Sequence, residues 1–364
     1  MVFLAGLADC LDELVLVGRL DPKPATWHYR IRAGVRFAAL PYYPDLSRYV
    51  PASIALDRSV RRFWSLLASV DAVWLLGPHP LALVFAVMGV LRRKRVVLGV
   101  RQDLPQYVCS RHPGRRSLFV LAQALELIFR SMTRRLPVVV VGAQLARHYS
   151  AARSRHTMVV SLVREQTWRF SPSLPDRSYE GDLRVLSVGR LDEEKNPLLM
   201  AEVLARLLGR ERRWRLVVCG DGPLREPLRQ RLEELGVGAR AELRGYVPID
   251  DGLIDLYRSS HALLHVSRTE GFPQVLLEAF AARLPVVGTT VGGVRDLADG
   301  CALLVPPDDA GAAAGALERI AGDSALRERL VTAALRVAQS HTLEAERERV
   351  VGFLDGRPDG AAER

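Results

Sequence analysis

The chain has 364 residues, of which 49% are hydrophobic and 25% charged, and its formal net charge is +10. This length fits two domains of roughly 150–200 residues better than one. The longest apolar run covers 11 residues, from Leu81 to Leu91, against the ~20 residues that a membrane helix needs, so we expect no membrane-spanning segment.

Charge and cysteine content favour a cytoplasmic protein with one basic half. The four cysteines lie far apart, without the paired spacing of a zinc site or the density of a disulfide framework. Residues 1–180 carry a net charge of +14 and residues 181–364 a net charge of −4. The basic half favours an anionic partner, such as a membrane surface bound peripherally, and no nucleic acid is expected. The alternative is compositional drift, since 48 of the 51 basic residues are Arg.

Short runs rich in Val and Leu alternate with helical segments, first in one half of the chain and then in the other. This alternation predicts two parallel sheets with helices on both faces, that is, two doubly wound α/β domains. The strands expected in the first half are Glu13–Val17, Phe37–Leu40, Ala72–Leu76, Arg95–Val100 and Pro137–Val141. Those expected in the second half are Leu183–Val188, Arg215–Cys219, Ala241–Leu243, Ala262–Val266, Pro285–Gly288 and Ala302–Val305.

A stretch without periodicity, rich in Pro and Ser, separates the two patterns at about 165–182. We therefore expect an N-terminal Rossmann-like domain over 1–170, a C-terminal one over 171–340 and a final helix over 341–356. Open α/β sheets bind ligands at the carboxyl ends of their strands. We expect the two domains to face each other across a cleft with one large site.

Polar residues follow two of the strands expected in the first half. His79 lies in the loop after one strand, and Gln102 and Asp103 follow the next, so all three would face the cleft. The alternative for His79 is an incidental loop histidine.

The helical stretch from Arg116 to Arg135 has an apolar surface wider than one core-facing stripe requires. We hypothesise that it docks on an anionic membrane together with the cluster Arg92–Arg95. The alternative is a helix sandwiched between the sheet and its neighbours.

The second half begins with a loop suited to a diphosphate. A strand ends at Gly189, and Arg190 and Lys195 follow before a helix that Asn196 would cap and Pro197 would start. Two cations beside a helix N-terminus favour a diphosphate ligand. The alternative is a solvated loop with Lys195 exposed.

Two weaker motifs follow. Gly220 and Gly222 permit a tight strand-to-helix turn with close backbone approach, and a purely structural turn is the alternative. Tyr246 and Val247, just after a short strand, would offer an aromatic face and backbone groups to a nucleobase, unless Tyr246 packs into the core.

The strongest motif runs from Ser267 to Phe280. Glu270 lies in a loop before a helix start at Pro273, and Glu278 lies within that helix. Carboxylates accept hydrogen bonds from sugar hydroxyls, so one Glu would bind the transferred sugar and the other the nucleotide. The alternative is a coincidence of surface charges. Free backbone N–H groups at the helix N-terminus would hold a phosphate, and they belong to Phe272, Gln274 and Val275.

Together these segments resemble the retaining glycosyltransferases of family 4 (glycosyl transferases group 1), which have the GT-B fold of two Rossmann-like domains. The ordered motifs that carry the resemblance, from about Leu183 to Pro307, are G-R-L-x3-K-N, G-x-G-P, G-Y-V, E-G-F-P-x3-L-E-A and P-V-V-x4-G-G. The resemblance implies transfer of a hexosyl group from a UDP- or GDP-sugar to a glycan or lipid-linked acceptor, with retention of anomeric configuration. It also implies that neither a metal nor a cofactor is needed.

The resemblance implies roles for single residues. Arg190 and Lys195 would neutralise the leaving diphosphate, Glu270 would hold the donor sugar and Glu278 the ribose. His79 matches a histidine common in the corresponding loop and is counted with the catalytic residues. Further contacts to the donor would come from Tyr246, Val247, Gly189, Gly222, Gly271, Phe272, Pro273, Gln274 and Val275.

The first half departs from the family pattern in three places. The chain starts in what resembles the helix after the usual first strand, so that strand is expected to be missing. Gln102-Asp103 stands where many relatives have His-Asp, and Leu162-Val-Arg164 stands where they have Pro-Asn-Gly. These departures leave open a catalytically impaired nucleotide-sugar-binding protein. A nucleotide-sugar epimerase of similar shape is the remaining alternative.

Overall fold

A computed structural model describes residues 2–21, 34–42, 49–111, 114–159, 161–168, 177–211 and 213–357. The chain divides into two units, one of Met1–Val159 with Ala345–Arg364 and one of Val160–Glu344, which we describe separately. The boundary expected between 170 and 171 lies outside the described residues, and the cleft between the domains stays a prediction. No helix in the described ranges is both long and apolar enough to cross a membrane.

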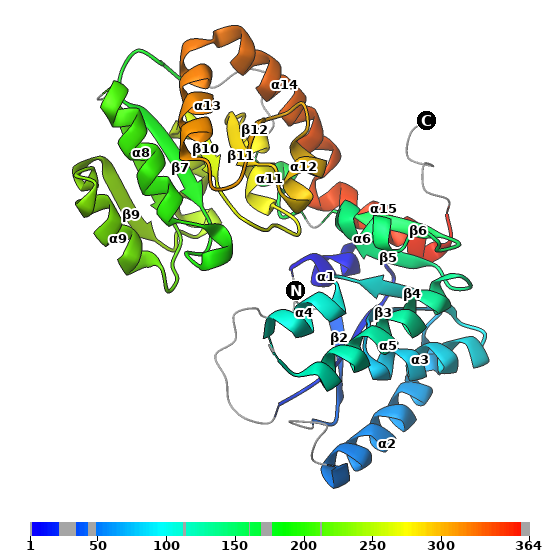
Figure 1. Ribbon diagram of the computed structural model, residues 1–364. Coiled ribbons are helices and arrows are strands. Elements are labelled where there is room, and N and C mark those ends of the chain that lie inside the picture. The colour runs from blue at the N-terminus through cyan, green and yellow to red at the C-terminus, as the bar shows by residue number, and fades with distance from the viewer. Residues whose placement is uncertain are drawn as a thin grey trace. The chain divides into compact units, whose positions relative to one another are not determined.

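Both units contain parallel sheets, as the alternating pattern predicts (Figure 1). The strands are β1 (Leu14–Arg19), β2 (Val35–Leu40), β3 (Ala72–Gly77), β4 (Arg95–Val100), β5 (Val138–Val141), β6 (Arg155–Met158), β7 (Leu183–Val188), β8 (Trp214–Cys219), β9 (Ala241–Gly245), β10 (Ala262–His265), β11 (Val286–Thr289) and β12 (Leu303–Val305). In the first unit β1 pairs with β2, and a second sheet has the order β3-β4-β5-β6. In the second unit one sheet has the order β12-β11-β10-β7-β8-β9.

Helices connect the successive parallel strands from β3 to β6 and from β7 to β12, as crossover connections between parallel strands require. Their bounds are α1 (Val2–Gly6), α2 (Tyr49–Leu66), α3 (Pro80–Leu91), α4 (Leu104–Arg111), α5 (Arg116–Thr133), α6 (Gly142–His148), α7 (Glu165–Trp168), α8 (Leu198–Arg210), α9 (Arg225–Glu234), α10 (Ile254–Ser259), α11 (Gln274–Ala281), α12 (Gly292–Ala298), α13 (Ala310–Gly322), α14 (Ser324–Ser340) and α15 (Leu343–Asp355).

The sheet of the second unit has the strand order of a dinucleotide-binding fold. The chain begins at the central strand β7, moves outward through β8 and β9, and then returns to β10 on the other side of β7. Strands β10 and β11 are buried along their whole length, which agrees with helices covering both faces of the sheet. The order reverses between β7 and β10, and open α/β sheets bind ligands at that point, beyond the carboxyl ends of the strands.

The first unit has its own core and includes the end of the chain. Phe63 of α2 stacks on Phe85 of α3, with ring centroids 3.9 Å apart, over the apolar side chains of β3, β4 and β5. From Ala345 onward, α15 belongs to this unit. Arg95 donates a hydrogen bond to the carbonyl oxygen of Phe353 at 3.0 Å, and the ring of Phe353 lies 5.5 Å from that of His156.

A largely buried arginine joins two helix ends of the second unit, on the side where β10 and β11 begin. Arg177 donates to the carbonyl oxygens of Arg258, Ala282 and Arg283, which lie at the C-termini of α10 and α11. Last-turn carbonyls have no partner within their own helix, so these bonds satisfy groups that would otherwise be left open. Burial lowers the pKa of the Arg177 guanidinium to about 10, and the group remains charged at neutral pH.

We therefore expect Arg177→Ala to destabilise the second unit by about 2–4 kcal/mol, because several carbonyl oxygens lose a charged donor at once. Urea unfolding of the full chain measures the effect. Arg215→Ala is the matched control: Arg215 is half-exposed and paired with Asp182, and such pairs contribute only about 0–1 kcal/mol. Equal losses for the two variants would contradict the capping role of Arg177.

Candidate functional site

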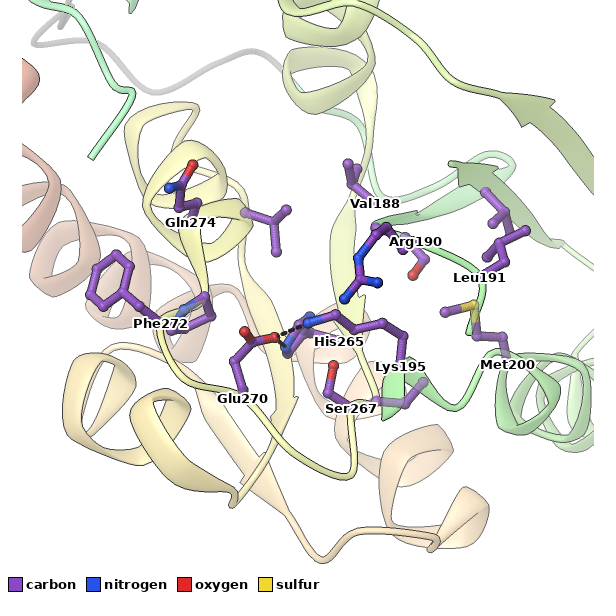
Figure 2. Close-up of a pocket in the computed structure, with 16 residues that line it drawn as sticks. Val188, Arg190, Leu191, Lys195, Met200, His265, Ser267, Glu270, Phe272 and Gln274 are labelled. Atoms are coloured by element: carbon purple, nitrogen blue, oxygen red, sulfur yellow. Dashed lines mark hydrogen bonds and ion pairs between the residues drawn. The ribbon is translucent and has the colours of Figure 1, made fainter. Parts of the chain in front are cut away.

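A pocket lies at the carboxyl ends of β7 and β10, where the strand order reverses (Figure 2). Its walls are the end of β7 with the loop that follows, the end of β10, and the first residues of α11. The site residues expected from the sequence that line it are Gly189, Arg190, Lys195, Glu270, Phe272, Pro273, Gln274 and Val275. The structure therefore brings together residues that lie up to 86 positions apart in the chain, from Gly189 to Val275.

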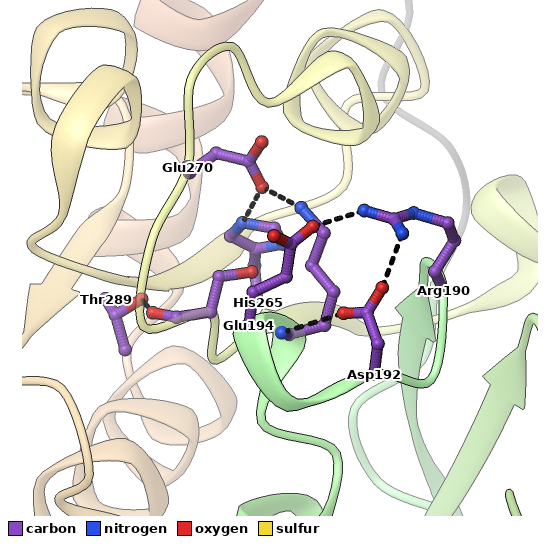
Figure 3. A network of polar contacts seen from close by, with 8 residues as sticks. Arg190, Asp192, Glu194, His265, Glu270 and Thr289 are labelled. Atoms are coloured by element: carbon purple, nitrogen blue, oxygen red, sulfur yellow. Dashed lines mark hydrogen bonds and ion pairs between the residues drawn. The ribbon is translucent and has the colours of Figure 1, made fainter. Parts of the chain in front are cut away.

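The centre of the pocket is an ion pair between its two walls. Lys195 Nζ lies 2.6 Å from Glu270 Oε2, and both side chains are largely buried, with exposed fractions of 18% and 10%. His265 Nε2 approaches the same carboxylate oxygen to 3.2 Å (Figure 3). Burial alone would raise the pKa of Glu270, but His265 and Lys195 outweigh it and hold that pKa below its ordinary value. Glu270 is thus an anion with a fixed position.

Arg190 is held much more loosely than Lys195. Its guanidinium lies 2.6 Å from Asp192 Oδ2 and also pairs with Glu194, but the side chain is 69% exposed. Exposed pairs of this kind contribute about 0–1 kcal/mol, so a doubly charged ligand can draw Arg190 away from Asp192 and Glu194 at little cost. Arg190 is therefore an exposed cation at the rim, and Lys195 a largely buried one at the centre.

Glycines allow the backbones of neighbouring loops around the pocket to approach each other closely, because they have no Cβ atom. A Cβ atom on Gly220 would lie 1.8 Å from the carbonyl oxygen of Gly189, and one on Gly293 would lie 2.3 Å from that of Gly271. The N–H of Gly293 also donates to the carbonyl oxygen of Glu270 at 3.0 Å. These contacts are backbone to backbone, so a larger residue at Gly220 would displace the Gly189 loop and one at Gly293 the Glu270 loop.

The helix starts differ from the expectations in two details. The N–H of Gln274 is not free, because it donates to the carbonyl oxygen of Phe272 at 3.1 Å, whereas the N–H of Val275 has no acceptor among the described residues. Asn196 does not cap α8 with its side chain. It takes a left-handed conformation, with φ at 52°, and its amide nitrogen donates to Asp308. Asn tolerates this conformation better than most residues.

Several expected donor contacts lie outside the pocket lining. Glu278 is buried on α11, where its Oε2 accepts a hydrogen bond of 2.7 Å from the hydroxyl of Tyr257. Burial without a cation raises the pKa of Glu278 to about 7. Tyr246 is 79% exposed just after β9, so the alternative in which it packs into the core is wrong. Val247 follows Tyr246 in the same loop, and Gly222 packs against the backbone of Leu191.

The expected residues of the first unit occupy helix starts. His79 precedes α3, and its Nδ1 accepts the N–H of Leu81 at 3.2 Å. Burial, with a smaller effect of Arg19, lowers the pKa of His79, so the imidazole is neutral at pH 7. Asp103 accepts the N–H of Gln106 at 2.9 Å in the first turn of α4, next to the exposed Gln102. The side chains of His79 and Asp103 thus stabilise helix N-termini, while any role of His79, Gln102 or Asp103 toward a substrate stays a prediction.

His265 is the pocket residue that the sequence analysis missed. It lies at the end of a strand that reads Ala-Leu-Leu-His, where the apolar pattern predicts only a buried core position. The signal that could have found it is its place: the last residue of a strand that leads into the loop of Glu270. Within the described ranges no three His, Cys, Asp or Glu side chains are grouped to hold a metal ion, and metal-independent action stays a prediction.

The segment that contains this pocket matches a family of known proteins. The model of the family described as Glycosyl transferases group 1 matches residues 175–337, which include the whole pocket. The rest of the chain lies outside this match. The motifs around Lys195 and Glu270 both lie within the segment that this family model matches.

Relatives of known sequence match mainly in this domain. A GalNAc-alpha-(1->4)-GalNAc-alpha-(1->3)-diNAcBac-PP-undecaprenol alpha-1,4-N-acetyl-D-galactosaminyltransferase of Campylobacter jejuni is 33% identical over 162 residues, which cover 43% of this chain and 43% of that protein. The chain therefore spans less than half the length of this relative.

Solved structures match over both units. The HepE protein (Alr3699) of Anabaena, in complex with UDP, superposes with a TM-score of 0.67 at 17% identity, covering 88% of this chain and 86% of that one. A sucrose-phosphate synthase of Thermosynechococcus elongatus gives 0.67 at 20% identity, covering 96% and 91%. These likenesses show the fold, which is GT-B with two Rossmann-like units in one chain.

The buried Glu278 generates a prediction about stability. The unfolded chain loses this proton near the ordinary pKa of 4.5, whereas the folded chain keeps it up to about pH 7, so the folded state binds more protons in between. Stability therefore falls as the pH rises from about 5 to 8. Glu278→Gln removes the ionisation and keeps an acceptor for Tyr257, so we expect it to be more stable than the wild type by about 2–3 kcal/mol at pH 8 and by little at pH 5. Thermal unfolding at both pH values measures this difference, and an equal effect at both would contradict it.

Proposed function

We propose that this protein transfers a hexosyl group from a nucleotide-diphosphate sugar to a glycan or lipid-linked acceptor with retention of anomeric configuration. The observation that carries the proposal is the Lys195–Glu270 pair at the switch point of a group 1 glycosyltransferase domain. In the ligand-free protein this pair places an ammonium and a carboxylate side by side. The ammonium can stabilise a diphosphate, and the carboxylate can accept hydrogen bonds from sugar hydroxyls.

The chemistry follows from where charge develops. As the glycosidic bond to the nucleotide breaks, negative charge grows on the diphosphate, and Lys195, Arg190 and the free N–H of Val275 would stabilise it. Positioned donors of this kind each contribute ~100-fold or more to a rate. Glu270 Oε1, which has no donor among the described residues, would accept a sugar hydroxyl. Retention by front-face attack and independence of metal are parts of this proposal.

The donor and acceptor classes are supported by the relatives. HepE was solved with UDP, and the Campylobacter enzyme carries an undecaprenol-linked acceptor in its name. We therefore propose a UDP-sugar as donor and a lipid-linked glycan as acceptor. The exposed Tyr246 would stack on the base.

A lipid-linked acceptor requires the protein to bind a membrane surface, and we propose that one surface of the first unit does so. The outer side chains of α3 and α5 are apolar and exposed: Val84, Val87, Val90, Leu91, Val120, Leu121, Leu127 and Ile128. Both helices lie on one face of the sheet, because β3, β4 and β5 are adjacent and parallel, and right-handed crossovers place their connections on the same side. We name these eight residues the α3–α5 face.

Charge favours an anionic bilayer as the partner of the α3–α5 face. Basic residues lie at the ends of both helices, at Arg92, Arg93, Arg116, Arg134 and Arg135, and residues 1–180 carry a net charge of +14. The core side of α5 is instead formed by Ala122, Glu126 and Phe129, so the exposed apolar stripe is not needed to hold the helix. An apolar stripe with a basic border is typical of helices that lie in a membrane interface.

The transfer reaction is tested by isothermal titration and turnover with a panel of UDP- and GDP-sugars. We expect Lys195→Met to weaken nucleoside-diphosphate binding by at least ~10-fold and Glu270→Gln to reduce transfer by at least ~100-fold while it changes nucleoside-diphosphate binding less than ~3-fold. Arg215→Ala, which alters the opposite end of β8, is the control for both. Binding of a nucleotide sugar without any transfer or hydrolysis would instead favour the catalytically impaired binder, and no binding by the wild type would reject the site.

The membrane partner is tested by co-sedimentation with vesicles that contain phosphatidylglycerol. Leu127→Glu places a charge in the α3–α5 face and should weaken binding by at least ~10-fold, because an exposed leucine that enters the bilayer contributes about 1.5–3 kcal/mol. Leu162→Glu is the matched control, since Leu162 is also exposed but lies in the other unit. The wild type should bind at low salt and release at high salt. Equal binding by the two variants would reject the α3–α5 face as the membrane surface.

A further inference from the structure

His265 has a place in the pocket that packing does not explain. Its side chain is 7% exposed, and the other residues of β10, Ala262, Leu263 and Leu264, are apolar and buried. Apart from the 3.2 Å approach to Glu270 Oε2, its Nε2 has no hydrogen-bonding partner in the part of the chain that the structure describes. A buried polar atom without other partners is costly unless it serves the group it faces.

Glu270 and the donor compete for Lys195. In the ligand-free protein Lys195 Nζ is 2.6 Å from Glu270 Oε2. Under the proposed function the same ammonium stabilises a diphosphate that carries more charge than one carboxylate. The stronger anion would draw Lys195 toward itself, and Glu270 would then lose its closest partner at the moment when it has to hold the sugar.

We propose that His265 is a positioning residue that keeps the Glu270 carboxylate in place while Lys195 moves its charge to the donor diphosphate. With a proton on Nε2, the imidazole donates to Oε2 and leaves Oε1 for a sugar hydroxyl. The inference rests on the proposed function, and it adds a residue that acts on the sugar only through Glu270.

Hydrogen bonds hold the backbone around the His265–Glu270 contact in place, so the position of the carboxylate depends on the partners of its own side chain. The Glu270 loop is fixed from behind by the bond from Gly293 N–H to the carbonyl oxygen of Glu270. On the next strand, Thr289 donates to the carbonyl oxygen of Ser267 at 2.6 Å (Figure 3). The remaining question is what holds the carboxylate itself, and among the described residues only Lys195 and His265 lie within ion-pair distance of it.

Two variants separate the polar contact from packing. His265→Leu keeps an apolar volume and removes the donor, whereas His265→Gln can place an amide N–H near the position of Nε2. For His265→Leu we expect kcat/KM for the nucleotide sugar to fall by at least ~10-fold while nucleoside-diphosphate affinity changes less than ~2-fold. His265→Gln should recover to within ~3-fold of the wild type. Equal losses in both variants, or unchanged turnover in His265→Leu, would overturn the positioning role.

A measurement on the ligand-free protein keeps this inference separate from the proposed function. Carboxyl ¹³C NMR on glutamate-labelled protein, with the Glu270 signal assigned from Glu270→Gln, reports the pKa of Glu270. That pKa should rise in His265→Leu and stay near its wild-type value in His265→Gln, because His265 helps to lower it. If it does not rise, the contact is absent and the inference fails even where transfer is observed. If it rises but the wild type binds no nucleotide sugar, the proposed function fails and the His265–Glu270 contact stands.

Discussion

The ion pair between Lys195 and Glu270 joins the loop after β7 to the loop after β10, across the point where the strand order reverses. Both groups are largely buried, so each pays a desolvation cost that the other offsets, and removing one partner of such a pair typically costs about 3–5 kcal/mol. In the ligand-free protein this pair links the two walls of the pocket. It also keeps a cation and an anion ready at the place where an open α/β sheet binds its ligand.

The rest of the site serves to hold those two side chains. The close approaches at Gly220 and Gly293 let neighbouring loops pack backbone to backbone, and the buried strands β10 and β11 give the loops a rigid base. Arg190 differs, because its exposed pairs with Asp192 and Glu194 are cheap to exchange. The site thus combines a largely buried cation, paired with Glu270 in the ligand-free protein, with an exposed cation at the rim.

Much of this arrangement follows from the sequence, because strand runs and loop motifs are local signals. The apolar runs predict most strands, and the E-G-F-P motif predicts the start of α11 within a residue. The sequence does not predict strand β6, since Arg-His-Thr-Met has neither a Val-rich run nor a strong turn signal. The bond from Tyr257 to Glu278, the left-handed Asn196 and the approach of His265 to Glu270 depend on residues distant in the chain, and periodicity carries no information about them.

The most direct test of the account is a crystal structure of the full chain with uridine diphosphate. The account predicts the diphosphate between the Gly189 loop and the N-terminus of α11, with a phosphate oxygen within hydrogen-bonding distance of Lys195 Nζ and of the Val275 N–H. It also predicts that Arg190 leaves Asp192 or Glu194 for the ligand, while Glu270 stays beside His265. A nucleotide bound elsewhere, or one bound here with the Lys195–Glu270 pair unchanged and no contact to Lys195, would contradict the account.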